Sequence, residues 1–378
     1  MDYRQSPNLS LRTKVSSDRL EVSLEEDDLG EPQNDEIVVR VEASPVNPSD
    51  LGLIFGAADP RRAIVKEAGG RRRLVIPLDE RQAGAMAARR DLSLCPGLEG
   101  AGTVVDASKR HEALIGRTVA IFGGGMYSRF RRISVDDCLL YPEGTAPASC
   151  ASSFVNPLTV LGFLETMRDE GHKALVHTAA ASNLGQMLVK VCLADGIDLI
   201  SIVRSPEQAR LLEAIGAKHV LNSKDEGFRG RLKDLVRETG ATLGFDAIGG
   251  GPLACDILTA MERAFTPKTF SMYGSVVNKQ VYVYGMLDSK TIEIRRTVGA
   301  AWGVGGWLMM NRMAALGSAR VDKLKQRVVR EIDTSFRSNF NATIGLEDMV
   351  DPELVIKMIG LETGAKYLLD PSLNGPRP

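Results

Sequence analysis

The sequence has few of the residues that build disulfide frameworks or metal sites. Its 378 residues include five cysteines and four histidines, which are scattered along the chain without a C-x-x-C pair. We therefore expect reduced thiols and no metal site. No run approaches the roughly twenty consecutive apolar residues of a membrane span, and the N-terminus lacks an apolar signal core. These absences predict a cytoplasmic protein with no membrane partner.

The charge is balanced, with 47 basic and 48 acidic residues and a net charge of -1. This balance gives no reason to expect nucleic acid as a partner. A hydrophobic content of 44% and a charged content of 25% are typical of a globular protein. The length predicts two domains rather than one undivided core.

The first third of the chain has the pattern of short antiparallel strands. Strands are predicted in "EIVVRVEASPVNPSD", "GAGTVVDA", "GRTVAIFG" and "FRRISVDDCLLYP". Residues 57–93 interrupt this pattern with nine Arg or Lys against five Asp or Glu. We interpret them as an insertion with a short helix around "ERQAGAMAARRD". The insertion could clamp an acidic substrate, although we favour a solvated loop.

After about residue 156, short apolar runs alternate with helical segments. The runs are "ALVHTAA", "LISIVRS", "HVLNS", "TLGFDAIGG" and "VYVYGML". Glycines mark the ends of the intervening helices at Gly196, Gly216 and Gly240. This alternation predicts a doubly wound parallel sheet, and hence an α/β protein. Near the end of the chain, "VDKLKQRVVREIDTSF" predicts a helix and "GAKYLLDP" a short strand.

The stretch "ALVHTAAASNLG" at residues 174–185 predicts a strand, a turn of small residues and the start of a helix. A helix N-terminus binds anions because its first N–H groups are unpaired. Small side chains in the turn would let a pyrophosphate approach the backbone. Gly185 would allow close packing, Asn183 tolerates a left-handed conformation, and Ser182 can donate a hydroxyl. An ordinary turn without a ligand remains the alternative. The candidate phosphate contacts are Ala181, Ser182, Asn183, Leu184 and Gly185.

The next strand, "LISIVRS", helps to decide between a phosphate site and an ordinary turn. A dinucleotide site presents an acid at this strand end to the ribose of NAD, or an arginine to the 2′-phosphate of NADP. This strand ends in Arg204 and Ser205 and carries no acid. We therefore predict NADPH as the cofactor, although an arginine at a loop is often only solvated.

Five stretches in order resemble the medium-chain dehydrogenase/reductase superfamily. They are "CPGLEGAGTVV", "FVNPLTVLGFLETM", "HTAAASNLGQ", "EQARLLEAIGAKHVLNS" and "TGAKYLLDP". The nearest branch is the zinc-independent quinone oxidoreductase-like and enoyl reductase-like enzymes. The resemblance spans nearly the whole chain except 57–93 and about 300–340.

This resemblance implies a GroES-like antiparallel β substrate domain plus a doubly wound Rossmann domain. Residues 1–155 together with 340–378 would form the first, and 156–339 the second. It also implies a homodimer, with "KTIEIRR" as the candidate edge strand. Thr159 would lie near the nicotinamide, and Gly249 and Gly250 would leave room for the cofactor, unless that pair is a plain turn. The backbone would meet the carboxamide at Tyr284, Gly285, Met286 and Leu287.

The zinc-dependent branch has Cys, His and Cys near the positions of Asn47, Leu98 and Val155. No zinc is therefore expected here, so the substrate oxygen needs another donor, for which the candidates are Asn47 and Tyr127. Either could instead be structural, since Asn47 can satisfy loop backbone and Tyr127 can pack. Some enoyl reductases of this branch use a tyrosine just after "NPSD", but "LGLIFGAAD" has none.

The sequence thus predicts an NADPH-dependent, zinc-independent reductase that transfers hydride to a quinone or an α,β-unsaturated carbonyl. Such reactions need an oriented nicotinamide and stabilisation of the developing negative oxygen. The alternative is a non-catalytic NADPH-binding redox sensor or structural protein of the same fold. A methyltransferase also has a doubly wound sheet, but it would lack the GroES-like flanks.

Overall fold

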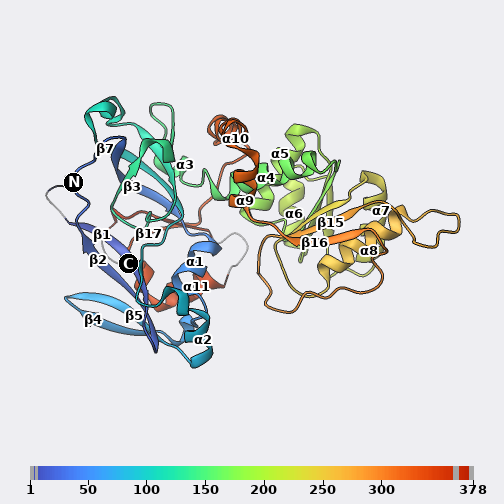
Figure 1. Ribbon diagram of the computed structural model, residues 1–378, viewed down its shortest axis with the longest axis horizontal. Helices are drawn as coiled ribbons and strands as arrows, with labels where there is room; N and C mark the ends of the chain where they lie inside the picture. Colours follow the sequence, from blue (N-terminus) through green and yellow to red (C-terminus); the bar gives the residue numbers. More distant parts are fainter. Residues whose placement is uncertain (1–3, 5–6, 361–365, 374–378) are drawn as a thin grey trace. The chain divides into compact units, whose positions relative to one another are not determined.

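The computed structural model describes residue 4, residues 7–360 and residues 366–373. The chain divides into two compact units (Figure 1). Unit 1 contains the residues up to Val155, 329–333 and those from Arg337 onward. Unit 2 contains 156–328 and 334–336. Each unit has its own sheet structure and its own hydrophobic core.

Unit 1 is built mainly of antiparallel strands in two sheets. One sheet has the order β4-β5-β2-β1-β6, and the other has the order β10-β8-β7-β3-β18-β17 with β9 also paired to β3. Among these pairs only β17 and β18 run parallel. The strands are β1 (Asn8–Val15), β2 (Arg19–Asp27), β3 (Glu36–Pro45), β4 (Ile64–Ala68), β5 (Arg71–Pro77), β6 (Ser93–Leu94), β7 (Glu99–Ala107), β8 (Thr118–Phe122), β9 (Phe130–Ser134), β10 (Cys138–Leu140), β17 (Ala342–Ile344) and β18 (Tyr367–Leu369).

Strand β18, near the end of the described chain, pairs with β3 from the first part of the chain. Leu368 pairs with Pro45 of β3, and the Val46 N–H donates to the Tyr367 carbonyl over 3.0 Å. Short helices pack beside the sheets: α1 (Pro48–Phe55), α2 (Glu80–Ala85), α3 (Pro147–Cys150) and α11 (Pro352–Ile359). Leu51, Ile54 and Val355 place α1 and α11 in one buried cluster with the inner faces of β1 and β2.

The 57–93 segment adds a hairpin and a helix to unit 1. Strand β5 pairs with β2, so the β4–β5 hairpin extends the edge of that sheet. Helix α2 confirms the short helix expected here. Arg71 and Arg73 form ion pairs with Glu26 and Glu21 on β2. The arginines of "GRRRL" therefore lie on a strand of a sheet and not in a loop.

Unit 2 is a parallel sheet with the order β13-β12-β11-β14-β15-β16. In chain order this is third, second, first, fourth, fifth and sixth, which is the Rossmann arrangement. The strands are β11 (Leu175–His177), β12 (Leu199–Val203), β13 (His219–Asn222), β14 (Leu243–Asp246), β15 (Lys279–Val283) and β16 (Trp302–Gly306). The predicted α/β class, with an antiparallel and a parallel part, is confirmed.

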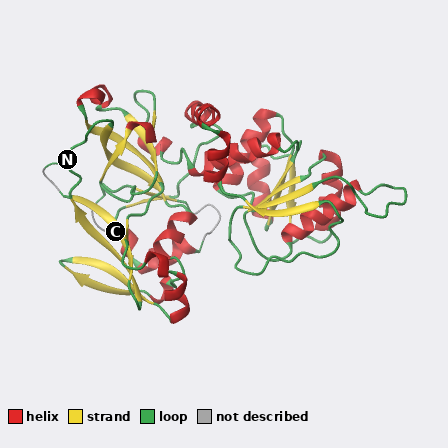
Figure 2. Ribbon diagram, in the orientation of Figure 1, coloured by secondary structure: helices red, strands yellow, loops and turns green. Residues whose placement is uncertain are grey.

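Helices cover both faces of this sheet (Figure 2). Leu232 of α7 and Ile257 of α8 enter one buried cluster with Val176 and Ile200 of the strands. On the opposite face, the Phe163 ring of α4 stacks on Phe245 at a centroid distance of 3.8 Å. The helices wholly in unit 2 are α5 (Asn183–Asp195), α6 (Pro206–Ala214), α7 (Phe228–Thr239), α8 (Leu253–Phe265) and α9 (Met309–Leu316). Helix α4 (Val155–Asp169) has its first residue in unit 1, and α10 (Ser318–Glu331) has its last three residues there.

The expectation that "KTIEIRR" forms the edge strand is wrong. In that stretch only Ile292 makes a bridge, to Gly251. The sixth strand is β16, which pairs in parallel with β15 from Lys279 opposite Trp302 to Val283 opposite Gly306. A glycine-rich segment becomes a strand here because the backbone of β15 offers it a complete row of partners.

Candidate cofactor and substrate sites

The turn between β11 and α5 has the close packing that a phosphate site requires. A Cβ on Gly185 would lie 2.1 Å from the Ala180 carbonyl oxygen, so only glycine fits there. The Ser182 hydroxyl caps α5 by accepting from the Gly185 N–H over 3.2 Å. Gly185 therefore gives the close packing that was predicted, and Ser182 caps the helix, a role that the sequence did not predict for it. The phosphate contacts themselves stay a prediction.

The left-handed residue of this turn is Ala179, not Asn183. Ala179 has φ 48°, whereas Asn183 is the first residue of α5. The expected left-handed role of Asn183 is therefore wrong. An alanine in this conformation costs about 1 kcal/mol relative to a right-handed one. The hydrogen bonds from Thr178 N to the Phe245 carbonyl and from Ala180 N to the Ile202 carbonyl hold it there, at 3.1 Å each.

Arg204 is exposed at the carboxyl end of β12. Its backbone N–H donates to the Gln208 side chain over 3.0 Å, and its guanidinium has no ion pair within the described ranges. Ser205 caps α6 by accepting from the Gln208 N–H over 3.3 Å. Arg204 therefore remains available for an anion, while Ser205 has a structural task.

The strand order reverses between β11 and β14, and a hydrogen-bonded pair joins their carboxyl ends. The Thr178 hydroxyl donates to Asp246 Oδ1 over 2.7 Å and accepts from the Ala247 N–H over 2.8 Å. Asp246 also accepts from the N–H groups of Ile248 and Gly249, at 2.9 and 3.3 Å. In open α/β sheets, ligands bind in the crevice at this reversal point.

The loops that follow β14 and β15 touch backbone to backbone. A Cβ on Gly249, which has φ 68°, would lie 2.3 Å from the Gly285 carbonyl oxygen. One on Gly285 would lie 2.5 Å from the Ala247 carbonyl oxygen, and one on Gly250 would lie 2.8 Å from that of Asp288. The structure thus brings Gly249 and Gly250 together with the 284–287 segment, in which Met286 is 89% exposed.

A buried aromatic layer lies beneath this edge of the sheet. His177 Nε2 is 2.7 Å from the Tyr284 hydroxyl, and Phe163 packs edge-on against Tyr284 and Trp307. Burial lowers the pKa of His177 to about 3, so its ring is neutral. Its Nδ1 has no partner among the described residues. Thr159 lies on α4 one turn before Phe163 and is 6% exposed.

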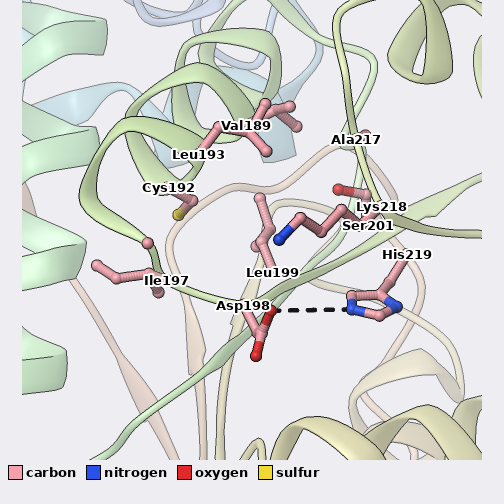
Figure 3. Close-up of a pocket in the computed structure, with 11 residues that line it drawn as sticks. Val189, Cys192, Leu193, Ile197, Asp198, Leu199, Ser201, Ala217, Lys218 and His219 are labelled. Atoms are coloured by element: carbon pink, nitrogen blue, oxygen red, sulfur yellow. Dashed lines mark ion pairs between the residues drawn. The ribbon is translucent and has the colours of Figure 1, made fainter.

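The hollow in Figure 3 lies at the opposite end of the strands. It has a volume of about 30 Å³ and lies between α5 and the starts of β12 and β13. Cys192, Asp198 and His219 are among its lining residues, with Asp198 Oδ1 3.9 Å from His219 Nε2. A cavity of this size holds about one water molecule. It is therefore unrelated to the crevice at the carboxyl ends.

Unit 1 contains a second polar cluster, around Asn47 and Glu99. The Asn47 amide Nδ2 donates to Glu99 Oε1 over 3.0 Å. Glu99 Oε2 accepts from the N–H groups of Phe154 and Val155, at 2.8 and 2.9 Å. Glu99 is fully buried and Asn47 is 3% exposed. Burial raises the pKa of Glu99, which these donors oppose.

Asp50 and Lys366 complete the charges of this cluster. Asp50 accepts from the N–H groups of Leu98 and Asn47, at 2.8 and 3.0 Å. Burial raises the pKa of Asp50 to about 6. The Lys366 ammonium donates to the Ser152 hydroxyl over 3.0 Å. Burial lowers the pKa of Lys366 to about 8, against the attraction of Glu99 and Asp50.

Tyr127 is fully buried in unit 1. Its hydroxyl donates to the Pro45 carbonyl over 3.2 Å, and its ring belongs to a hydrophobic cluster with Leu11 and Ile54. Burial raises the pKa of Tyr127 well above its ordinary value. These contacts favour the packed role over the donor role, and donation of a proton by Tyr127 stays a prediction.

Comparison with known proteins finds relatives for part of the chain. A family model described as zinc-binding dehydrogenase matches residues 184–300. A "Probable quinone oxidoreductase" of Leishmania amazonensis is 31% identical over 161 residues, which are 41% of this chain and 45% of that protein. The mitochondrial enoyl-[acyl-carrier-protein] reductase of Caenorhabditis elegans is 26% identical over 250 residues, 64% of this chain and 63% of that protein. The matches thus span less than two thirds of these relatives.

A solved structure extends the likeness to both units. The crystal structure of a Mesorhizobium loti protein assigned as an NADPH:quinone reductase covers 97% of this chain and 99% of its own, with 22% identity and a TM-score of 0.71. Over the part that the family model and these relatives cover, the chain is similar to quinone oxidoreductases of the medium-chain dehydrogenase/reductase type. The solved structure extends the shared fold to nearly the whole chain. Its relatives are oxidoreductases, and the fold is that of a GroES-like and a Rossmann domain.

The description of the matching family model names zinc, but the side chains of this protein do not fit that ion. The zinc branch places its ligands at the positions of Asn47, Leu98 and Val155. Here these residues turn N–H groups toward the carboxylates of Asp50 and Glu99, and an N–H group cannot bind a cation. No three His, Cys, Asp or Glu side chains form a metal-binding group in the part of the chain that is described. No helix of that part is long and apolar enough to cross a membrane.

Several residues of these sites were not predicted from the sequence. Glu99 is an acid at the start of an apolar strand, and Asp246 is an acid at the end of another. An acid inside an apolar run is a signal that could have identified both. His177 and Thr178 give no comparable signal, because their partners Tyr284 and Asp246 lie 107 and 68 positions away.

Proposed function

We propose that this protein is an NADPH-dependent, zinc-independent reductase acting on a quinone or an α,β-unsaturated carbonyl. The observation that carries the proposal is Arg204, whose guanidinium has no ion pair among the described residues. It lies at the end of β12, the strand beside β11, where the strand order reverses. The free guanidinium matches the 2′-phosphate that distinguishes NADPH from NADH.

The cofactor would be held at the edge formed by the carboxyl ends of the strands of unit 2. The first N–H groups of α5, from Ser182 to Gly185, would receive the pyrophosphate at the positive end of the helix. The 284–287 backbone would receive the carboxamide, and Thr159 would lie beside the nicotinamide. The bound cofactor supplies the hydride, and the chain orients it and excludes water.

On the substrate side, Asn47 is the proposed donor to the oxygen that becomes negative when carbon or quinone accepts hydride. One N–H of its amide is taken by Glu99, which leaves the second for the substrate oxygen. The proton that completes the reduction would come from solvent or from Tyr127. Transfer from Tyr127 would require its hydroxyl to leave the Pro45 carbonyl.

Replacing Arg204 with alanine tests the cofactor assignment. We expect the Kd for NADPH to rise about 10- to 100-fold, because a charge-assisted hydrogen bond to phosphate is lost, while the Kd for NADH stays the same. Fluorescence titration with each nucleotide measures both. Arg210→Ala is the matched control, since Arg210 is also exposed but pairs with Glu207. Equal losses for both nucleotides in Arg204→Ala would contradict the assignment.

Turnover distinguishes the enzyme from the alternative, a redox sensor or structural protein that binds NADPH without reaction. Steady NADPH consumption with a quinone or an enone, monitored at the nicotinamide absorbance, supports the reductase. Tight binding of NADPH without consumption across a panel of both substrate classes would favour the sensor.

We also propose a homodimer in the cytoplasm. The edge strand β16 pairs only with β15 among the described strands, so one side of its backbone is free for a second copy. Sedimentation velocity tests the dimer. Gly306→Pro should weaken it, because the backbone of Gly306 faces away from β15 and proline removes its N–H donor. A monomer at micromolar concentration would contradict this part of the proposal.

A further inference from the structure

The carboxylate of Glu99 joins three separate segments of unit 1. Its Oε1 binds the amide of Asn47, which precedes α1, and its Oε2 binds the N–H groups of Phe154 and Val155 at the start of α4. The Ser44 hydroxyl fixes the backbone of the same residue by donating to the Glu99 carbonyl over 2.7 Å. Glu99 therefore receives hydrogen bonds on both carboxylate oxygens and on its carbonyl.

An ionised carboxylate can only accept hydrogen bonds. An asparagine amide offers a carbonyl oxygen on one side and an NH₂ group on the other, and it can be turned over by rotation of the terminal bond. Opposite Glu99 only the NH₂ side of Asn47 makes a favourable contact. The charge of Glu99 therefore selects one of two amide orientations.

Both residues are buried, Glu99 with no exposed surface and Asn47 with 3%. Lys366, which attracts Glu99, is held in place by Ser152 and lies 5.2 Å from the centroid of the Phe340 ring.

We propose that Glu99 is a positioning residue that fixes the Asn47 amide with its NH₂ group ready for the substrate oxygen, at the place where the zinc-dependent branch holds its ion. This inference rests on the proposed function. The carboxylates of Glu99 and Asp50 join the segments of Asn47, Leu98 and Val155 through N–H donors. The donor to the substrate is then an oriented amide.

The Glu99→Gln variant tests the orientation. The glutamine oxygen must stay with the Phe154 and Val155 N–H groups, so its NH₂ group faces Asn47 and the Asn47 amide turns over. We expect kcat for an enone or quinone to fall on the order of 100-fold, with KM for NADPH unchanged within about twofold. Glu262→Gln is the control, since Glu262 is a buried acid of unit 2 that pairs with Lys279. An unchanged kcat in Glu99→Gln, or an equal loss in Glu262→Gln, overturns the proposal.

The double variant Asn47→Asp with Glu99→Gln separates positioning from mere stabilisation. The hydrogen bond re-forms with donor and acceptor exchanged, and the charge is conserved. We therefore expect Tm to recover relative to Glu99→Gln while kcat stays low, because position 47 no longer has a donor. Recovery of both Tm and kcat would show that Glu99 only stabilises the fold.

The wild-type protein provides a test that does not depend on how the variants fold. With ¹⁵N-labelled asparagine, the Asn47 side-chain NH₂ should show one proton shifted downfield and protected from exchange, and this signal is assigned by its loss in Asn47→Ala. Two equivalent, rapidly exchanging protons would overturn the proposal. This result is independent of turnover, so a protein that holds the amide but consumes no NADPH refutes the proposed function and not the orientation.

Discussion

Each unit has a buried ionisable group beside its candidate site, and the two groups differ in kind. In unit 1 it is the acid Asp50, which accepts from the N–H groups of Asn47 and Leu98 next to the buried acid Glu99. In unit 2, which also buries acids such as Asp246 and Glu262, it is the neutral base His177, with one ring nitrogen bonded to Tyr284. Burial raises the pKa of Asp50 to about 6 and lowers that of His177 to about 3. Acid therefore acts on these two groups in opposite directions.

The buried polar side chains have a different structural role in each unit. In unit 1 the acids connect chain segments and orient an amide. In unit 2 the hydrogen bond between Thr178 and Asp246 joins the carboxyl ends of β11 and β14. Most of the residues that follow these strands are small, so large side chains cover little of the backbone there. The first arrangement suits a substrate oxygen, and the second suits a flat, phosphate-bearing ligand.

The largest expected effect concerns unit 2 alone and comes from Gly185→Ala. Its Cβ would lie 2.1 Å from the Ala180 carbonyl oxygen, so the turn must move. We expect a loss of about 3 kcal/mol in the stability of unit 2 and loss of measurable NADPH binding. Fluorescence of Trp302 and Trp307 during urea unfolding reports on unit 2, because both tryptophans of the sequence lie in it.

Gly230→Ala is the control for this change. Gly230 lies inside α7 with nothing within 4 Å of its added Cβ, so alanine should stabilise the helix by up to about 1 kcal/mol. A Gly185→Ala protein that binds NADPH like the wild type would show that the turn is not the phosphate site.

The next effect is the response to acid. The stability contributed by His177 is fully present above its ordinary pKa of 6.5 and is lost as pH falls toward about 3. Between pH 7 and pH 4 this loss is about 3 kcal/mol for unit 2. The tryptophan-monitored urea midpoint measures it, and His177→Gln should reduce the pH dependence. If the urea midpoint of His177→Gln depends on pH as strongly as that of the wild type, the assignment to His177 is wrong.

Unit 1 should respond in the other sense over the same range. The folded-state pKa of Asp50 is raised above 3.8, so its contribution is present below that value and is lost as pH rises through about 6. Hydrogen exchange, corrected for its intrinsic pH dependence, measures this difference. At pH 4, peptides from β3 and β7 should be better protected than peptides from the strands of unit 2. A parallel loss in both units would remove the contrast.

The smallest effect comes from Thr178→Val. The isosteric valine leaves the Ala247 N–H without its acceptor and removes one donor to Asp246. We expect unit 2 to lose about 2 kcal/mol, with unit 1 unaffected. Thr178→Ser keeps the hydroxyl and should recover most of the loss. A valine variant as stable as the wild type would mean that this hydrogen-bonded pair contributes little.

The sequence predicted most of unit 2 because its strands are continuous apolar runs bounded by glycine. It did not predict β16, whose residues "WGVGG" have little strand propensity and depend on the backbone of β15. The left-handed conformation was assigned to Asn183 by residue type, whereas long-range hydrogen bonds place it at Ala179.

The candidate sites divide in the same way. Gly185 and Arg204 could be proposed as cofactor contacts because a turn and a strand end have local signatures. Glu99 escaped because its partners Asn47 and Phe154 lie 52 and 55 positions away, and only the folded chain brings them together. Asn47 was chosen for its loop, but the charge that orients it could not be derived from that loop.

The position of β18 has a consequence for synthesis on the ribosome. All six strands of unit 2 lie between Leu175 and Gly306, so its sheet can form while later residues are still being added. The sheet of unit 1 instead waits for Tyr367 to reach Val46. The strand β3 is thus synthesised early, but the sheet that contains it is completed only after β18 has been synthesised. Until then the backbone of β3 near Pro45 lacks its partner and can bind a chaperone or pair with a wrong strand.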